Sequence, residues 1–315
     1  MHGAANTYGL KKDILNGEYK ISKYSRFKVY EPKERDIVST KFRDRQFQRS
    51  LTDNYLYDAI TKSFIYDNHA CQIGRGTDSA RNRLAIHLGK HNREHGNAGY
   101  ILKCDLHNYF GSTSHVLAKA AVAKRVHDIW ARKCVYDIID SYDGDRGIGL
   151  GSQITQLIEL AMLDDLDHII KEQLHVKHYI RYMDDFMIIH KDKEVLWQCL
   201  ETINEWLSTY ELELNAKKTQ IIPASKTVRF LGFNYRIANN GRVLRTLPKD
   251  KITHERRKLR KQVALAKQGQ MTKAQVNECY QSWRAHAAKG NNHKLVLKID
   301  KYYKDLWRET DAKNQ

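Results

Sequence analysis

The chain has 315 residues, a hydrophobic fraction of 41% and a formal net charge of +17, which fits a soluble globular protein with room for two or three subdomains. No run reaches the roughly 18 apolar residues of a membrane-spanning helix, the N-terminus lacks a signal-peptide pattern, and no two cysteines form a Cys-x-x-Cys pair. We therefore expect a cytoplasmic protein without a membrane partner, whose positive charge favours a polyanionic ligand bound in a salt-dependent way.

The first segment with a chemical signal follows a polar N-terminal arm. Residues 27–30 alternate as a β-strand does, and Lys33 and Arg35 follow two positions apart, on one face of an extended chain. Two cations on one face can clamp a triphosphate, and arginine adds a two-pronged hydrogen-bonding fork. An exposed strand with a basic surface is the alternative interpretation.

A glycine-rich, basic loop comes next. Residues 41–60 have a loose helical spacing, and residues 70–80 form a loop that contains Arg75 and opens a second helix. Such a loop can approach a nucleic-acid backbone, because the start of a helix favours phosphate. A loop that only caps the helix explains the same pattern.

An aspartate stands at the end of the next predicted strand. Residues 100–104 read Tyr-Ile-Leu-Lys-Cys, which predicts a buried strand that delivers Asp105 at its end. Phe110 stands five residues later. A helix is predicted for about 114–140, with a break near Lys124.

A flexible loop then precedes a helix. Residues 147–156 read Gly-Ile-Gly-Leu-Gly-Ser-Gln-Ile-Thr-Gln, and apolar residues recur at helical spacing over about 155–174. Glycine in this loop lets the backbone come close to a bound nucleotide.

The central stretch is residues 176–190, where two short apolar runs flank adjacent aspartates. The runs 178–182 and 186–190 are rich in Tyr, Ile and Phe, and a tight turn between them would hold Met183, Asp184 and Asp185 at its tip. Two carboxylates on one turn raise each other's pKa unless a cation lies between them, and Mg²⁺ prefers oxygen ligands. A solvent-exposed Asp-Asp turn is the alternative.

The remaining third becomes increasingly basic. An amphipathic helix is predicted over 195–210, and residues 212–220 turn back to a strand. Residues 228–235 alternate into a hairpin whose turn is 238–241. Beyond residue 250 we expect a basic helix and two further helices, about 272–288 and 293–308. The basic helix is either a solvated face or part of a bundle that follows a nucleic-acid backbone.

The ordered set of motifs resembles the reverse transcriptase family across roughly residues 27–235. The matching segments are Lys33 with Arg35, Gln72–Ser79, Asp105–Phe110, Tyr182–Asp185, Leu214–Thr219 and Phe230–Phe233. The resemblance implies an α+β, right-hand polymerase fold. Its expected division is fingers with an N-terminal arm at 1–98, a palm at 99–235 with part of the fingers at about 114–150, and a helical thumb at 236–315.

One motif resembles a subgroup. Most bacterial relatives carry Gln-Gly-x-x-x-Ser-Pro before the palm helix, whereas this chain has Leu150, Gly151, Thr155 and Gln156 at the corresponding positions. That pattern is similar to reverse transcriptases of diversity-generating retroelements, apart from Thr155 in place of Ser. The resemblance implies a bacterial or phage source and error-prone synthesis of cDNA at template adenines. It also implies two partners, the element's own RNA and a small, basic, oligomeric accessory protein.

The resemblance also implies a role for each matched residue. Asp105, Asp184 and the Leu106 carbonyl would hold two Mg²⁺ ions, with Asp185 supporting them. Residues expected to contact the incoming dNTP are Lys33, Arg35, Phe110, Leu150, Gly151, Gln156 and Lys218. Phe110 would exclude a ribose 2′-hydroxyl, and Lys218 would donate a proton to pyrophosphate. Residues expected to bind template RNA, primer or cDNA are Arg75, Phe230, Leu231, Gly232, Arg256, Arg257, Arg260 and Lys261.

Other functions fit the same residues. A reverse-transcriptase-like scaffold without activity would bind RNA only. An antiviral polymerase of this type would make DNA without a nucleic-acid template. A group II intron or retron enzyme would be the nearest enzymatic alternative.

Overall fold

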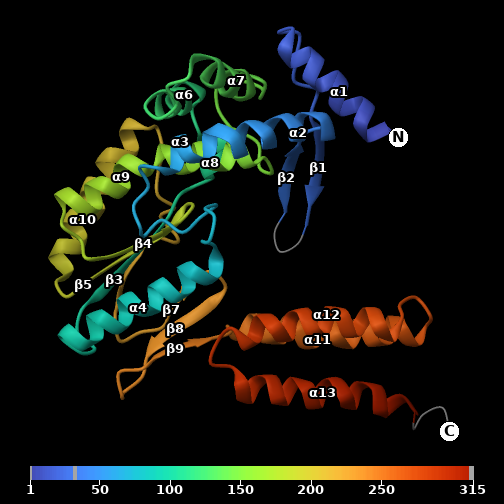
Figure 1. Cartoon of the computed structure of the whole chain (residues 1–315). Helices are drawn as coiled ribbons and strands as arrows, with labels where there is room; N and C mark the ends of the chain where they lie inside the picture. The colour runs from blue at the N-terminus through green and yellow to red at the C-terminus, as the bar shows by residue number, and fades with distance from the viewer. Residues whose placement is uncertain (1, 31–33, 312–315) are drawn as a thin grey trace. The chain divides into compact units, whose positions relative to one another are not determined.

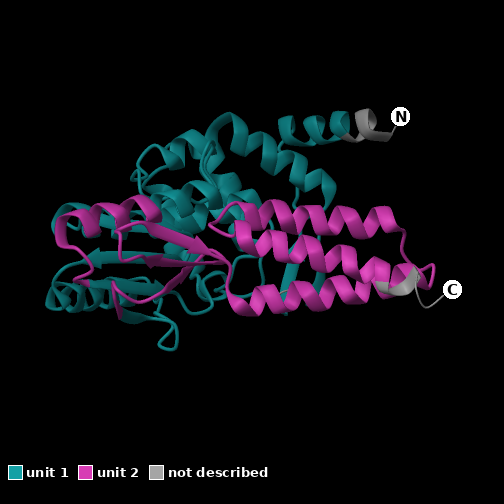
Figure 2. Ribbon diagram, turned by 90° about the horizontal axis from the view of Figure 1, so that it is seen from below, with its two compact units in different colours: residues 1–83, 100–221 teal, residues 84–99, 222–315 magenta. Residues whose placement is uncertain are grey.

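The computed structural model describes residues 2–30 and 34–311. Contacts divide the chain into two compact units, residues 1–83 with 100–221 and residues 84–99 with 222–315 (Figure 2). The expected division into fingers, palm and thumb stays a prediction.

The first unit consists mostly of helices, with a four-stranded sheet and a separate two-stranded ribbon (Figure 1). Its N-terminal elements are α1 (His2–Leu15), β1 (Ser25–Val29), β2 (Arg35–Ser39), α2 (Phe42–Leu51), the π-helix η1 (Thr52–Leu56), α3 (Tyr57–Thr61) and the start of α4 (Thr77–His95). Its later elements are β3 (Tyr100–Asp105), α5 (Tyr109–Ser112), α6 (His115–Ala123), α7 (Ile129–Asp140), α8 (Gln153–Met162), α9 (Asp164–His168), η2 (Ile169–Gln173), β4 (His178–Tyr182), β5 (Asp185–His190), α10 (Lys193–Thr209) and β6 (Gln220–Pro223).

The four-stranded sheet has the order β4-β5-β3-β6. Strand β5 is antiparallel to both β4 and β3, and its first residue, Asp185, stands opposite Tyr182 on β4 and Asp105 on β3. The register therefore brings the ends of two predicted motif strands to the same edge of the sheet. The antiparallel sheets together with the helices confirm the predicted α+β class.

Helix α8 lies in the core of the first unit. Eight of its residues are buried, from Ile154 to Met162, including Thr155 and Glu159. It packs against α2, α3 and α6. A helix that is buried on almost every side, mostly through apolar residues, lies at the centre of its unit. Its first turn directly follows the glycine-rich loop that contains Gly147, Gly149 and Gly151, so the core fixes where that loop ends.

The second unit combines a small sheet with helices. Its elements are β7 (Val228–Phe230), β8 (Phe233–Ile237), β9 (Val243–Thr246), α11 (Lys249–Lys267), α12 (Lys273–Ala288) and α13 (His293–Asp311), joined by the second part of α4. Leu259, Tyr280 and Ile299 form the core between the three C-terminal helices. The predicted basic helix and the two helices after it are thereby confirmed.

Several predicted boundaries need correction. The helix predicted over 155–174 breaks after Met162, because Leu163 leaves the helical region at ψ 1°. The alternating run 228–235 is two strands, since Leu231 and Gly232 adopt positive φ angles of 42° and 84° that no strand allows. The predicted break near Lys124 is confirmed: α6 ends at Ala123, before α7 begins.

Within the described residues, none of the helices combines the length and apolar character required to cross a membrane.

Candidate active site

Strand β3 carries Asp105 to the edge of the sheet. Its side chains at Ile101, Leu102 and Cys104 are buried, so the strand is fixed by the core while Asp105 remains 14% exposed. The backbone beyond it is also fixed, because His107 N–H donates to the Glu213 carbonyl at 2.9 Å. A carboxylate at the end of a buried strand is a rigidly placed ligand.

The hairpin turn beside Asp105 consists of Met183 and Asp184. We predicted three residues at the tip, but β5 already begins at Asp185, which pairs with both neighbouring strands. Two-residue hairpin turns favour a positive φ at their first position, and Met183 adopts 56°. The Asp184 carbonyl accepts a hydrogen bond from Leu106 N–H at 3.3 Å, which ties the turn to the end of β3. Of the two adjacent aspartates, only Asp184 therefore lies at the tip, beside the end of β3.

Burial and nearby negative charge raise the pKa values of Asp184 and Asp185. Burial raises the pKa of Asp184 above its usual range, and the charge of Asp105 raises it further, whereas Lys218 and Arg35 oppose the shift. Burial also raises the pKa of Asp185 to about 7, with Asp184 and Asp105 adding to the effect. Among the described residues Asp185 Oδ1 has no hydrogen-bond partner. An additional cation would relieve this repulsion.

Lys218 supplies one positive charge to the site. Its Nζ lies 2.5 Å from Asp105 Oδ1, although 113 positions separate the two residues in the sequence. The loop that carries it is anchored by Asn215, whose N–H donates to the Asp105 carbonyl at 2.7 Å. Lys218 is thus held at the end of β3 by both its side chain and its loop.

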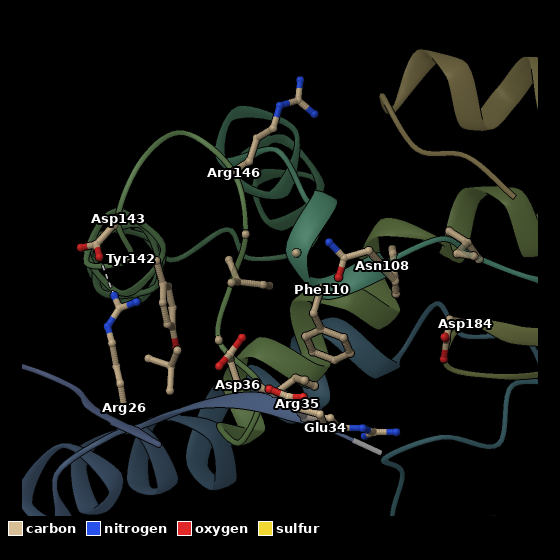
Figure 3. A pocket seen from close by; sticks show the side chains of 18 of the residues that line it. Arg26, Glu34, Arg35, Asp36, Asn108, Phe110, Tyr142, Asp143, Arg146 and Asp184 are labelled. Carbon is tan, nitrogen blue, oxygen red and sulfur yellow. Dashed lines mark hydrogen bonds and ion pairs between the residues drawn. The ribbon is translucent and has the colours of Figure 1, made fainter. Parts of the chain in front are cut away.

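A cavity of about 710 Å³ opens beside the turn. Figure 3 shows that its walls come from the ribbon at Arg35, from the segment after β3 at Asn108 and Phe110, and from the hairpin at Asp184. Leu106, Leu150 and Lys218 also line it. The volume lies within the range of small-molecule sites. Lys33 lies outside the described residues.

Phe110 and the glycine-rich loop form one wall together. Phe110 is half-buried, and its carbonyl accepts a hydrogen bond from Ile148 N–H at 2.9 Å. A Cβ on Gly149 would lie 2.6 Å from the Tyr142 ring and 2.9 Å from Val38 Cβ, so only glycine fits there. This close packing presents Leu150 to the cavity.

Other predicted residues lie elsewhere in this unit. Gly151 and Gln156 are absent from the cavity wall, and Cys71 Sγ contacts Gln156 Oε1 at 3.2 Å. Arg75 Nη1 donates to the carbonyls of Tyr66 and Asn68, and its guanidinium lies over the Tyr66 ring at 4.9 Å. The Arg75 contacts hold the loop that contains Arg75 against the segment 66–68. The ligand contacts proposed for Gly151, Gln156 and Arg75 stay predictions.

The donor set fits a hard divalent ion. No three acidic, histidine or cysteine side chains converge into a complete metal-binding group in the part of the chain that the structure describes. Mg²⁺, however, is usually bound by one or two carboxylates together with substrate phosphates. Asp105 and the buried Asp184, whose pKa is raised, lie beside an open cavity and match that arrangement.

Comparison with known families decides the identity. Residues 31–235 match the family described as reverse transcriptase (RNA-dependent DNA polymerase), which is more than half of the chain. The chain belongs to the reverse transcriptase family. No curated protein sequence matches it.

Solved structures support the expected fold of this reverse transcriptase. Telomerase from Candida albicans, in complex with a TWJ fragment of telomeric RNA, matches with a TM-score of 0.51 and 10% identity over 82% of this chain and 54% of that one. Apo telomerase from Candida tropicalis matches with a TM-score of 0.54 and 12% identity, over 74% of this chain and 52% of that one. A form of the Candida tropicalis telomerase truncated from its C-terminal domain matches with a TM-score of 0.52 and 13% identity, over 76% of this chain and 59% of that one. The chain thus spans a little over half the length of these structures, and the right-hand polymerase fold is confirmed.

The second unit of the reverse transcriptase carries the remaining predicted residues. Phe230 is buried on β7, and Leu231 and Gly232 form the turn to β8. Four basic side chains of α11 are exposed, namely Arg256, Arg257, Arg260 and Lys261. Their opposite face buries Leu259 and Val263. The predicted nucleic-acid contacts of these residues stay predictions.

Sequence reasoning missed several residues of the cavity wall. Arg26, Asn108 and Arg146 line it, and Arg26 Nη2 pairs with Asp143 at 2.5 Å (Figure 3). Arg146 directly precedes the glycine-rich loop that begins at Gly147, and this position in the sequence could have indicated that it lines the site. Arg26 carried no such signal, because only the folded ribbon brings it to the cavity.

Proposed function

We propose that this reverse transcriptase is an RNA-directed DNA polymerase that extends a primer with dNTPs on an RNA template. The observation that carries the proposal is the meeting of Asp105 and the Asp184 turn at one sheet edge, beside a cavity bordered by Arg35 and Lys218. Reverse transcriptase domains generally use divalent ions, typically Mg²⁺. This geometry supports nucleotidyl transfer within the family's chemistry.

Asp105, Asp184 and the Leu106 carbonyl would hold the Mg²⁺ ions, two of them in the proposed mechanism. When bound, they would lower the pKa of the primer 3′-hydroxyl and neutralise the triphosphate. Asp185 would support the turn from β5. With cations at the carboxylates, Lys218 would be released from Asp105 to donate a proton to the departing pyrophosphate.

The cavity walls would select the nucleotide. Arg35, with Lys33, would clamp the triphosphate through charge-assisted hydrogen bonds. Phe110 would pack under the sugar and exclude a 2′-hydroxyl, because it lines the cavity and its backbone carbonyl is held by Ile148 N–H. Leu150 would face the incoming nucleotide without offering a hydrogen bond.

We further propose that the enzyme serves a diversity-generating retroelement. The support is the motif with Leu150, Gly151 and Gln156, in which an aliphatic residue replaces the usual glutamine. Its partners would be the element's template RNA and a small, basic, oligomeric accessory protein. A pair of near-repeats differing at adenines beside the gene would support this assignment, and a group II intron or retron there would contradict it.

The activity is tested by primer extension on an RNA template with Mg²⁺. The wild type should extend the primer in a template-dependent way, whereas Asp184→Asn should abolish extension with an unchanged circular dichroism spectrum. Asp192→Asn, an exposed aspartate just after β5, is the matched control and should retain activity. Synthesis without a template, or near-wild-type extension by Asp184→Asn, would contradict the proposal.

A further inference from the structure

Arg181 is a fully buried arginine on β4, two residues before the turn that carries Asp184. Its guanidinium forms a two-pronged pair with Asp167 of α9, with Nε at 2.7 Å from Oδ1 and Nη2 at 2.6 Å from Oδ2. The Tyr179 hydroxyl donates to the same Oδ1 at 2.6 Å. The carboxylate of Asp167 thus fixes the plane and position of the guanidinium.

The same guanidinium reaches two backbone carbonyls. Nη1 donates to the Met183 carbonyl at 3.2 Å, and Nη2 donates to the Leu160 carbonyl of α8 at 3.3 Å. Met183 is the turn residue with φ 56°. Since Leu106 N–H holds the next carbonyl, that of Asp184, at 3.3 Å, two successive carbonyls of the turn are fixed from different elements.

The backbone of Arg181 is anchored as firmly as its side chain. Its N–H donates to the Asp67 carbonyl at 3.0 Å, and its carbonyl accepts from His69 N–H at 3.1 Å. One residue therefore links the loop near residue 68, helices α8 and α9, and the catalytic turn. The guanidinium is thus a fixed point from which the turn is held.

We propose that Arg181, oriented by Asp167, is the positioning residue that fixes Asp184 for metal-dependent catalysis. The inference rests on the proposed polymerase function. A buried ion pair adds little stability beyond what apolar side chains of the same size provide. Apolar side chains cannot, however, replace the donor to the Met183 carbonyl. The guanidinium is thus specifically required for the geometry of the turn.

The test is the double substitution Arg181→Met with Asp167→Leu in the full-length protein. It removes both charges and keeps similar volume, but it leaves the buried Tyr179 hydroxyl and Leu160 carbonyl without these partners, so the melting temperature should fall by several degrees while the protein stays folded. The kcat of primer extension should fall about 10- to 100-fold, because small misplacements of reacting groups have effects of that size. The KM for dNTP should change by less than about threefold, because the parts of the cavity wall that carry Arg35, Phe110 and Lys218 are untouched.

A matched control lies on the same helix. Asp164 of α9 pairs with Arg125 at 2.8 Å, and both side chains are buried, but neither contacts the turn. The double substitution Arg125→Met with Asp164→Leu should leave kcat within about twofold of wild type. An equal loss of kcat in both double variants would overturn the positioning role, because it would show a general effect of disturbing α9.

Wild-type kcat in the Arg181→Met, Asp167→Leu protein would also overturn the proposal. If that protein does not fold, Arg181→Lys decides, because lysine keeps the charge beside Asp167 but its single ammonium cannot span all the acceptors. A folded Arg181→Lys protein with reduced kcat supports the positioning role, and one with wild-type kcat overturns it. Absence of extension by the wild type would instead count against the polymerase function itself.

Discussion

Glu159 is a fully buried carboxyl group on α8 that takes no part in the proposed chemistry. Its Oε1 accepts a hydrogen bond from Thr113 Oγ1 at 2.7 Å, and Oε2 has no partner among the described residues. Burial raises the pKa of Glu159 to about 8, although hydrogen bonds from Thr113 and Tyr109 oppose the shift. The folded protein therefore retains a proton that the unfolded chain releases above its ordinary carboxyl pKa.

This buried proton predicts a pH dependence of stability. The contribution of Glu159 is fully present below the unfolded pKa of about 4.5 and is lost as the pH rises towards 8. Glutamine does not ionise, so the Glu159→Gln variant does not lose this stability as the pH rises. The urea midpoint of the variant minus that of the wild type should therefore be larger at pH 8.5 than at pH 5.5. Glu201→Gln, on the exposed face of α10, is the control and should show no such difference. Equal shifts at both pH values would show that Glu159 ionises normally.

Leu150 predicts a change in fidelity. It lines the cavity but has no hydrogen-bonding group, so it cannot help to fix an incoming nucleotide. Leu150→Gln should lower misincorporation opposite template adenine. A change of about 1.4 kcal/mol in the free-energy gap between correct and incorrect insertion corresponds to a tenfold change in the misincorporation rate. Single-nucleotide insertion of each dNTP opposite each template base measures this. Leu150→Met keeps the site apolar and should behave as wild type. High wild-type fidelity opposite adenine would contradict both this prediction and the retroelement assignment.

At the scale of elements, α11 separates its two faces by chemistry. Leu259 and Val263 are buried on one side, and basic side chains cover the other. Arg256 also packs over the Tyr302 ring at 4.7 Å, which leaves its charge at the surface of the helical bundle. A stable apolar face allows the basic face to be altered without unfolding the helix.

The basic face of α11 predicts salt-dependent nucleic-acid binding. Replacing Arg256, Arg257, Arg260 and Lys261 with alanine should weaken template–primer binding and flatten its salt slope by up to about one unit for each phosphate that the helix no longer neutralises. A matched control removes four exposed lysines of α13, namely Lys294, Lys298, Lys301 and Lys304. If both variants change the template–primer affinity and its salt slope equally, only the net charge matters and the prediction of a specific role for α11 is wrong.

At the scale of the whole molecule, the second unit is discontinuous in sequence. It contains residues 84–99, which include the second part of α4, as well as residues 222–315. Leu84 and Leu88 on that part of α4 are buried, and a Cβ on Gly89 would lie 3.9 Å from Val243 of β9. The fold of this unit therefore depends on segments more than 100 positions apart.

Two truncations test this dependence. A chain ending at residue 225 keeps β6, loses β7–β9 together with α11–α13, and exposes Leu84 and Leu88. Exposure costs about 1.5–3 kcal/mol for each of these two side chains. This chain should melt about 10 °C lower than wild type and bind a hydrophobic dye. A chain ending at residue 248 keeps that sheet and loses only α11–α13, so it should melt nearer to wild type. Equal melting temperatures for the two fragments would contradict the discontinuous unit.

The sequence by itself determined the local chemistry of this protein. The buried strand before Asp105, the apolar runs around Asp184, the glycine-rich loop and the basic helix are patterns of a few residues each, so side-chain periodicity and glycine content were enough to find them. Their order along the chain was enough for the family. The end of the turn was misplaced by one residue because strand pairing with β3 decides where β5 begins.

Only the tertiary structure decided which distant residues share the site. Lys218 reaches Asp105 across 113 positions, and Arg26 reaches the cavity wall from the N-terminal ribbon. Arg181 and Asp167 look like ordinary strand and helix residues in the sequence, and their pairing follows from packing α8 and α9 against the sheet. Such contacts depend on how complete elements pack together, and no local pattern of side chains encodes that packing.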